Sequence, residues 1–109
     1  MLAAAPAEAQ DVASSTGAIL RGLDKITGET IDLTLAVGDT QSFGRLAVSL
    51  TDCRYPVNDP ASNAYAQMII FEEGAETPVF DGWMIASSPA LSALDHPRYD
   101  VWVLRCANT

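Results

Sequence analysis

Several chemistries are poorly represented in this sequence of 109 residues, which contains one histidine and two cysteines. A zinc site needs three or four His, Cys or carboxylate ligands, and beyond the single histidine and a cysteine pair expected to form a disulfide only carboxylates remain. The sequence also lacks a Cys-x-x-Cys redox motif, a Gly-x-Ser-x-Gly nucleophile elbow and an EF-hand loop. We therefore expect no metal, no cofactor and no catalytic residue, and we interpret the protein as a non-enzyme.

Basic residues are scarce too, since six Lys and Arg stand against 14 Asp and Glu, for a formal net charge of −8. The basic residues are scattered and form no stripe that would neutralise phosphates, which argues against a nucleic acid partner. There is no run of about 18 apolar residues, so we expect no direct membrane insertion. The acidic charge suits a basic protein surface or a cationic ligand, although solubility alone also explains it.

The first ten residues, MLAAAPAEAQ, contain Ala7-Glu8-Ala9, a pattern that fits a signal-peptidase site before Gln10. We interpret residues 1–17 as a signal-peptide remnant and flexible lead-in, and residues 18–109 as a single β domain. A chance match in an Ala-rich tail is the alternative. The expected location is the periplasm.

Cys53 and Cys106 are far apart in the sequence and have no third cysteine to compete with them. One pair in a small exported domain is typical of a disulfide. The prediction requires Cα atoms about 5.5–6 Å apart. Two buried free thiols are the alternative.

Period-two alternation of apolar residues predicts about six strands. Leu46, Val48 and Leu50 are expected to point inward, with Cys53 on the opposite face. Prolines and glycines mark turns or loops between the strands, including 38–44 and 55–63. A Ser-Pro pair followed by spaced leucines predicts one short helix near 88–95, capped by Ser88. The fold class is therefore all-β, a small antiparallel barrel or sandwich. The expected strands span residues 18–26, 29–37, 45–54, 64–73, 79–87 and 98–106.

The stretch from Phe80 to Cys106 holds both tryptophans and the histidine. A Ser–His–Asp triad could be drawn from Ser87 or Ser88 with His96, but only proximity in sequence supports it. We expect at least one tryptophan to anchor the core, with Trp102 in that role, and His96 to lie at the surface. The alternative is an exposed aromatic patch used for docking. The candidate interaction surface consists of Trp83, Met84, Ser87, Ser88, His96 and Tyr99.

Three stretches carry a family resemblance: LRGLDKITG (20–28), VGDTQSFGRLAV (37–48) and FDGWMIASSPALSALDHPRYDVWVLRC (80–106). They resemble the alphaproteobacterial exported family of the uncharacterised domain numbered 2155. The resemblance implies a signal peptide, a cysteine pair at Cys53 and Cys106, and no assigned catalytic residue. It also implies an accessory link to respiratory complex I, because family members are often encoded beside a small accessory subunit of that complex.

From these observations we expect a non-catalytic periplasmic domain that binds or stabilises another envelope or membrane-complex protein. Its oligomeric state is not fixed by the sequence. The alternative is a periplasmic binding module for a small molecule or an envelope polymer, with a barrel mouth lined by Trp83, Met84 and Tyr99. A hydrolase is the third and weakest hypothesis.

Overall fold

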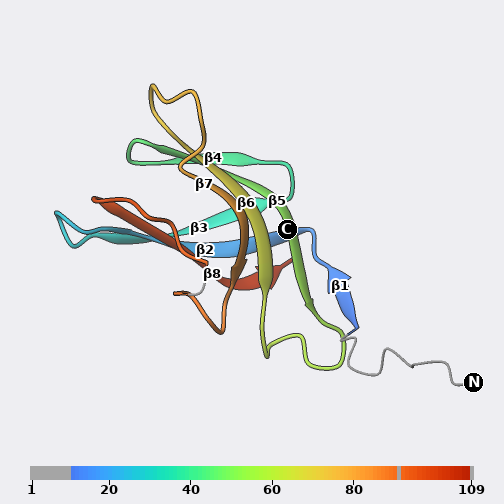
Figure 1. Ribbon diagram of the computed structural model, residues 1–109. Helices are drawn as coiled ribbons and strands as arrows, with labels where there is room; N and C mark the ends of the chain where they lie inside the picture. The colour runs from blue at the N-terminus through green and yellow to red at the C-terminus, as the bar shows by residue number, and fades with distance from the viewer. Residues whose placement is uncertain (1–10, 91, 109) are drawn as a thin grey trace, which may run out of the picture.

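The computed structural model describes residues 11–90 and 92–108. These residues form eight β-strands in two antiparallel sheets (Figure 1). The all-β prediction is confirmed, and the architecture is an open sandwich rather than a closed barrel. The signal-peptidase pattern at residues 7–10 lies outside the described residues.

The long sheet has the strand order β1-β5-β6-β7, and β4 also pairs with β5. Strand β5 is the longest, so it has room for β4 beside its first half and β1 beside its last residues. The strands of this sheet are β1 (Val12–Ser14), β4 (Thr40–Phe43), β5 (Leu46–Pro56), β6 (Tyr65–Glu72) and β7 (Phe80–Ile85).

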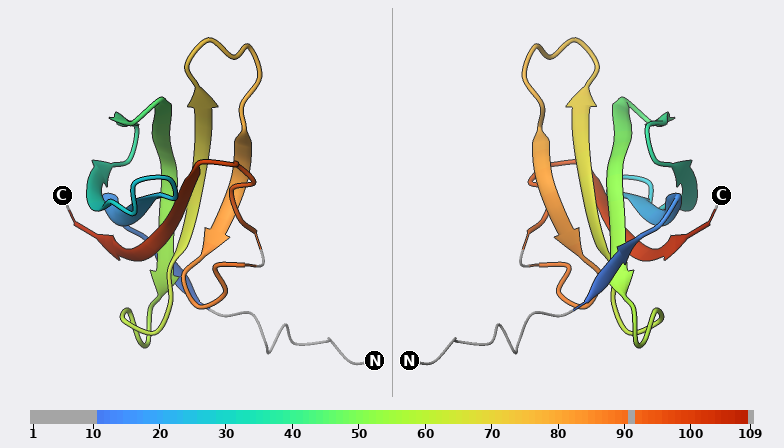
Figure 2. Two further views of the ribbon diagram at one scale, coloured as in Figure 1. Left: turned by 90° about the vertical axis from the view of Figure 1, so that its left-hand side faces the viewer. Right: turned by 90° about the vertical axis from the view of Figure 1, so that its right-hand side faces the viewer.

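The short sheet has the order β3-β2-β8, with β2 (Gly17–Asp24), β3 (Thr30–Ala36) and β8 (Tyr99–Ala107). Strands β2 and β3 form the predicted hairpin, and Gly28 takes the positive φ of 79° that its turn requires. Figure 2 shows β8 crossing over the strands of the long sheet.

The core lies between the two sheets and follows the alternation of the strands. Leu46, Val48 and Leu50 point inward from β5, as predicted. Burial of such aliphatic side chains is the main favourable term in folding, at about 25 cal/mol per Å² of apolar surface. The largest fully buried side chains are Leu20, Leu33, Leu46, Leu50, Met68, Ile70, Met84, Val48, Val101, Val103 and Cys53.

Three elements differ from the sequence prediction. Strand β1 lies within the segment assigned to a flexible lead-in, and β4 lies within the segment 38–44 assigned to a loop. The helix expected at 88–95 is absent, because none of the described residues is helical. Leu94 of this segment is buried in the core by an irregular chain path instead. Leu91 lies outside the described residues.

Two β-bulges change the direction in which the cysteines point. The pairing of β5 with β6 skips Thr51, and the pairing of β8 with β2 skips Leu104. Each extra residue reverses the alternation beyond it. Cys53 is therefore buried on the face of Leu50, and the prediction that it lies on the opposite face is wrong. Cys106 is turned inward in the same way, opposite the buried Ala18.

Candidate functional site

The Cys53–Cys106 disulfide joins the long sheet to the short sheet. The two Cα atoms are 5.7 Å apart, which confirms the predicted pairing and distance. Cys53 is fully buried, whereas Cys106 is half-buried. The bond therefore fixes the end of β8 against β5, directly beside Arg54.

The predicted interaction surface does not form one surface. Met84 and Tyr99 are each only 2% exposed and His96 is 8% exposed, so these three side chains belong to the interior. Trp83 is half-buried on the outside of the long sheet, and Ser87 is exposed beyond the end of β7. The expectation that His96 lies at the surface is therefore wrong.

His96 is held through both ring nitrogens, by hydrogen bonds at Nδ1 and by a contact between Nε2 and the Glu72 carboxylate. Nδ1 accepts the backbone N–H groups of Arg98 at 3.0 Å and Tyr99 at 3.2 Å. A nitrogen that accepts hydrogen bonds carries no proton, so the proton of the neutral ring lies on Nε2, which is 3.3 Å from the Glu72 carboxylate. The ring takes the place of a backbone acceptor for the turn before β8.

Tyr99 fills the space next to His96, and its ring centroid is 5.2 Å from that of the histidine. Its hydroxyl oxygen accepts the backbone N–H of Arg45 at 3.2 Å. Gly44 has a φ of 57°, and a Cβ there would lie 2.5 Å from the Tyr99 hydroxyl. The turn between β4 and β5 therefore closes over this tyrosine only because residue 44 is a glycine.

Asp24 and Arg98 form the ion pair at this end of the molecule, with Nη2 and Oδ2 2.8 Å apart. Asp24 Oδ1 also accepts the backbone N–H groups of Ile26 and Thr27. The hydrogen bond from Arg98 is the main reason that the pKa of Asp24 is lowered to about 2. Burial opposes this shift, and the hydrogen bonds from the two N–H groups add to it. The carboxylate is thus an ionised turn cap and not a proton carrier near neutral pH.

The remaining motif residues near Ser88 hold the chain without a helix. The backbone N–H of Ser88 donates to the carbonyl of Ile85 at 3.1 Å, and the N–H of Ser87 donates to Asn63 Oδ1 at 3.0 Å. The predicted cap at Ser88 has no helix to cap. Neither serine is among the hydrogen-bond partners of His96 in the described part of the chain, so the triad drawn from sequence is not assembled.

An apolar surface containing Trp83 lies on the outside of the long sheet. We call it the Trp83 surface, and its members are Val12, Arg54, Tyr65, Trp83 and Ile85, around a shallow hollow of about 320 Å³. The Arg54 guanidinium lies 5.1 Å from the Trp83 ring centroid and is paired with Asp52 at 2.8 Å. The register explains the gathering, because Arg54 pairs with Tyr65 and Tyr65 pairs with Ile85 on adjacent strands.

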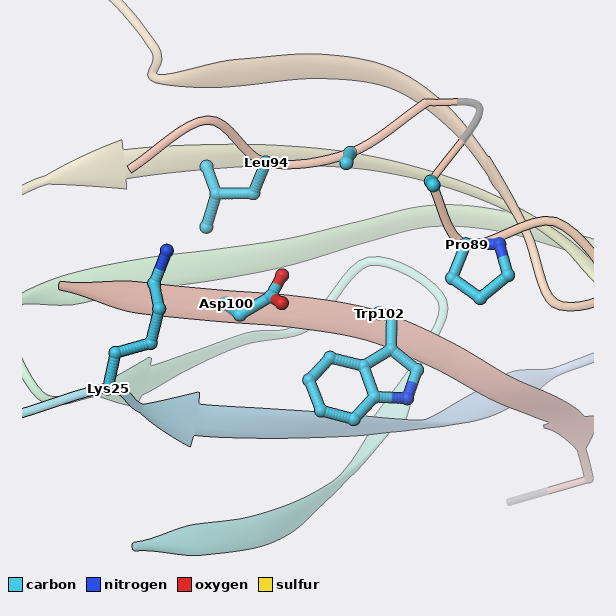
Figure 3. Close-up of a pocket in the computed structure, with 7 residues that line it drawn as sticks. Lys25, Pro89, Leu94, Asp100 and Trp102 are labelled. Atoms are coloured by element: carbon cyan, nitrogen blue, oxygen red, sulfur yellow. The ribbon is translucent and has the colours of Figure 1, made fainter. Parts of the chain in front are cut away.

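A second cavity, which we call the Trp102 cavity, lies where the segment after β7 passes over β8. Trp102 was expected in the core, but its indole is half-buried and lines this cavity of about 360 Å³ (Figure 3). The sequence analysis missed the cavity because the covering segment was assigned to a helix. The lining residues are Lys25, Pro89, Ala90, Ala93, Leu94, Asp100 and Trp102.

Residues 18–106 match the family model described as "Uncharacterized protein conserved in bacteria (DUF2155)". The chain belongs to this family. An uncharacterised protein of Rickettsia prowazekii (strain Madrid E) is 31% identical to the chain over 87 residues, covering 77% of this chain and 56% of the relative. The DUF2155 chain thus spans little more than half of that relative's length. No solved structure matches it.

The three stretches that carried the resemblance meet at one end of the DUF2155 sandwich. Asp24 comes from the first, Gly44 and Arg45 from the second, and His96, Arg98 and Tyr99 from the third. The hydrogen bonds among them close turns and end strands. No group of three or more metal-ligating side chains is found in residues 11–90 and 92–108. No helix in those residues is long and apolar enough to cross a membrane.

Proposed function

We propose that this domain is a non-catalytic binding module of the bacterial envelope, which docks a partner protein through the Trp83 surface. The observation that carries the proposal is that Trp83, Tyr65 and Arg54 meet on an outward sheet face beside Ile85 and Val12. Tryptophan, tyrosine and arginine are the residue types enriched at binding hot spots.

The outer face of the long sheet carries more apolar side chains than is usual for a sheet face exposed to water. Strand β6 buries Ala66, Met68 and Ile70, yet its alternate positions include Tyr65, Ile69 and Phe71, and Phe71 is 37% exposed. In an antiparallel sheet with one solvated face, polar residues are the usual occupants of these positions. An apolar outward face suits a surface that is covered in a complex.

The charge of the domain indicates the partner's surface. At a net charge of −8, association is favoured with a surface that presents an apolar centre and a basic rim. The partner we propose is a protein of an envelope or membrane complex, and respiratory complex I is the one implied by the family resemblance. The disulfide supports the envelope location, because such bonds persist in oxidising compartments.

Site-specific photo-crosslinking in cells tests this proposal. A photoreactive phenylalanine analogue at position 83 or 85 is expected to give a discrete adduct with one partner, and the same analogue at Ile26 is not. Ile26 is the matched control because it is 73% exposed on the β2–β3 turn, away from this surface. Equal adducts from positions 83 and 26 would contradict docking at the Trp83 surface.

A substitution measures the same contact. Trp83→Ala is expected to remove about 2 kcal/mol of binding free energy, about a 30-fold rise in Kd for the crosslinked partner. The folded state should persist, because Trp83 lies outside the core. Surface plasmon resonance with the partner gives the constant. Unchanged affinity in both Trp83→Ala and Trp83→Glu would exclude this surface.

A further inference from the structure

The Trp102 cavity combines an aromatic floor with three polar groups of different kinds. Asp100 and Trp102 lie two residues apart on one face of β8, so their side chains are neighbours. Figure 3 shows the side chains of Lys25, Asp100 and Trp102 side by side along one wall of the cavity, with Leu94 and Pro89 on the opposite side. Its volume of about 360 Å³ is within the range of ligand sites, roughly 300–1,000 Å³.

The polar groups of the cavity keep hydrogen-bonding capacity that the fold does not satisfy. The Asp100 carboxylate and the Trp102 indole N–H make no hydrogen bond or ion pair with the described residues, although both residues are half-buried. Lys25 Nζ donates to the His96 carbonyl at 2.7 Å, which orients the ammonium group and leaves two of its N–H groups unused. The cavity therefore offers one acceptor and two kinds of donor.

The charges in the cavity disfavour ionic ligands of either sign. A cation attracted to Asp100 would also meet the ammonium of Lys25, and an anion attracted to Lys25 would meet Asp100 and a net charge of −8. A neutral group that both donates and accepts hydrogen bonds meets neither obstacle. Hydroxyl groups have this property, because each carries one donor and two acceptor positions.

We propose that the Trp102 cavity binds a neutral carbohydrate. The C–H face of a pyranose ring would pack on the Trp102 indole. Adjacent hydroxyls would donate to the Asp100 carboxylate and accept from Lys25, since charge-assisted hydrogen bonds of this kind are the stronger ones. The site is separate from the Trp83 surface, because Trp102 belongs to the short sheet and Trp83 to the long sheet.

Titration of the ¹⁵N-labelled protein, followed by NMR, tests the proposal. The probes are glucose, galactose, N-acetylglucosamine, and the β-1,4-linked dimer and trimer of N-acetylglucosamine. At least one is expected to shift the Trp102 indole N–H signal, which is assigned by its loss in Trp102→Phe. Absence of a saturable shift with all five probes would overturn the proposal, as would saturation by L-leucine or L-lysine in place of the sugars.

Variants locate the binding. Trp102→Ala and Asp100→Ala are each expected to weaken the best sugar about tenfold or more. Ile26→Ala is the matched control and should bind as wild type does, because Ile26 lines no part of the cavity.

Trp83→Ala separates this proposal from partner docking. Loss of sugar binding in Trp83→Ala, with Trp102→Ala unaffected, would place the ligand on the other sheet and overturn the assignment. Dispersed NMR spectra of each variant show that it is folded.

Discussion

Single side chains replace backbone acceptors where the segment before β8 joins the sandwich. Arg98 and Tyr99 each direct a backbone N–H at His96 Nδ1, and Tyr99 is itself buried. A buried donor without a partner costs free energy close to that of a lost hydrogen bond, so the ring has a structural task. Sequence patterns did not predict that His96 would act as this acceptor, because the role depends on the tertiary structure around the turn and not on a local motif.

Substitution of His96 is expected to destabilise the fold. His96→Ala removes the acceptor for two N–H groups and the contact with Glu72, and should lower the free energy of unfolding by about 2–4 kcal/mol. His96→Asn should restore part of that loss, because the Asn side-chain oxygen can occupy the place of Nδ1 as an acceptor. Urea unfolding at neutral pH measures both.

The glutamine variant is the control for this prediction. In His96→Gln the side-chain amide reaches further, towards the Nε2 position, and should not restore the bonds to Arg98 and Tyr99. If His96→Ala were as stable as wild type, the ring would not be acting as the acceptor of this turn.

At the scale of elements, alternation predicted both ends of each of the six longer strands to within two residues. It missed β1 and β4, which have three and four residues. Each is too short and too polar to show a period, and each forms only because β5 offers an unpaired edge. A strand that forms only by pairing with the free edge of another strand cannot be predicted from its own residues.

Bulges set a second limit on prediction from alternation. The period of two assigned Cys53 correctly to the end of a strand but to the wrong face, since nothing in the local sequence marks Thr51 as an extra residue. The same holds for Leu104 before Cys106. The disulfide was predictable from cysteine arithmetic, whereas the two bulges that bring the sulfurs together were not.

The segment from Ser88 to Asp95 has local helix signals that the tertiary structure overrides. Because no helix forms in its described residues, Ser88 has no free N–H groups to cap. Ser88→Ala is therefore expected to change the free energy of unfolding by no more than about 0.5 kcal/mol, as for other substitutions that remove no contact. Thermal unfolding checks this. A loss of about 1 kcal/mol, typical of a lost N-cap, would show that the hydroxyl does cap a helix in solution.

At the scale of the whole molecule, the candidate site could be predicted only in part. Trp83 lies on the outside of the long sheet. Neighbours along a strand point to opposite faces, so Met84 had to be buried once Trp83 was outside. Trp102 was assigned to the core because tryptophan is usually buried. Its position beneath an irregular segment depends on the path that joins the two sheets, and no periodic pattern specifies that path.

The disulfide is the one side-chain cross-link between the sheets in the described residues, and its loss should lower the stability of the whole molecule. With a sequence separation of 53 between the cysteines, the chain-entropy model assigns about 4 kcal/mol to the cross-link. Urea unfolding with and without a reductant is expected to show a loss of this size, and Cys53→Ala with Cys106→Ala should match the reduced protein. Next to the disulfide, the Ser15 hydroxyl donates to the Ala107 carbonyl and the Ser15 N–H donates to the Cys53 carbonyl. On reduction we therefore expect amide exchange to rise first in β1 and at the end of β8. A reduced protein within about 1 kcal/mol of the oxidised one would show that packing between the sheets, and not the cross-link, holds the sandwich together.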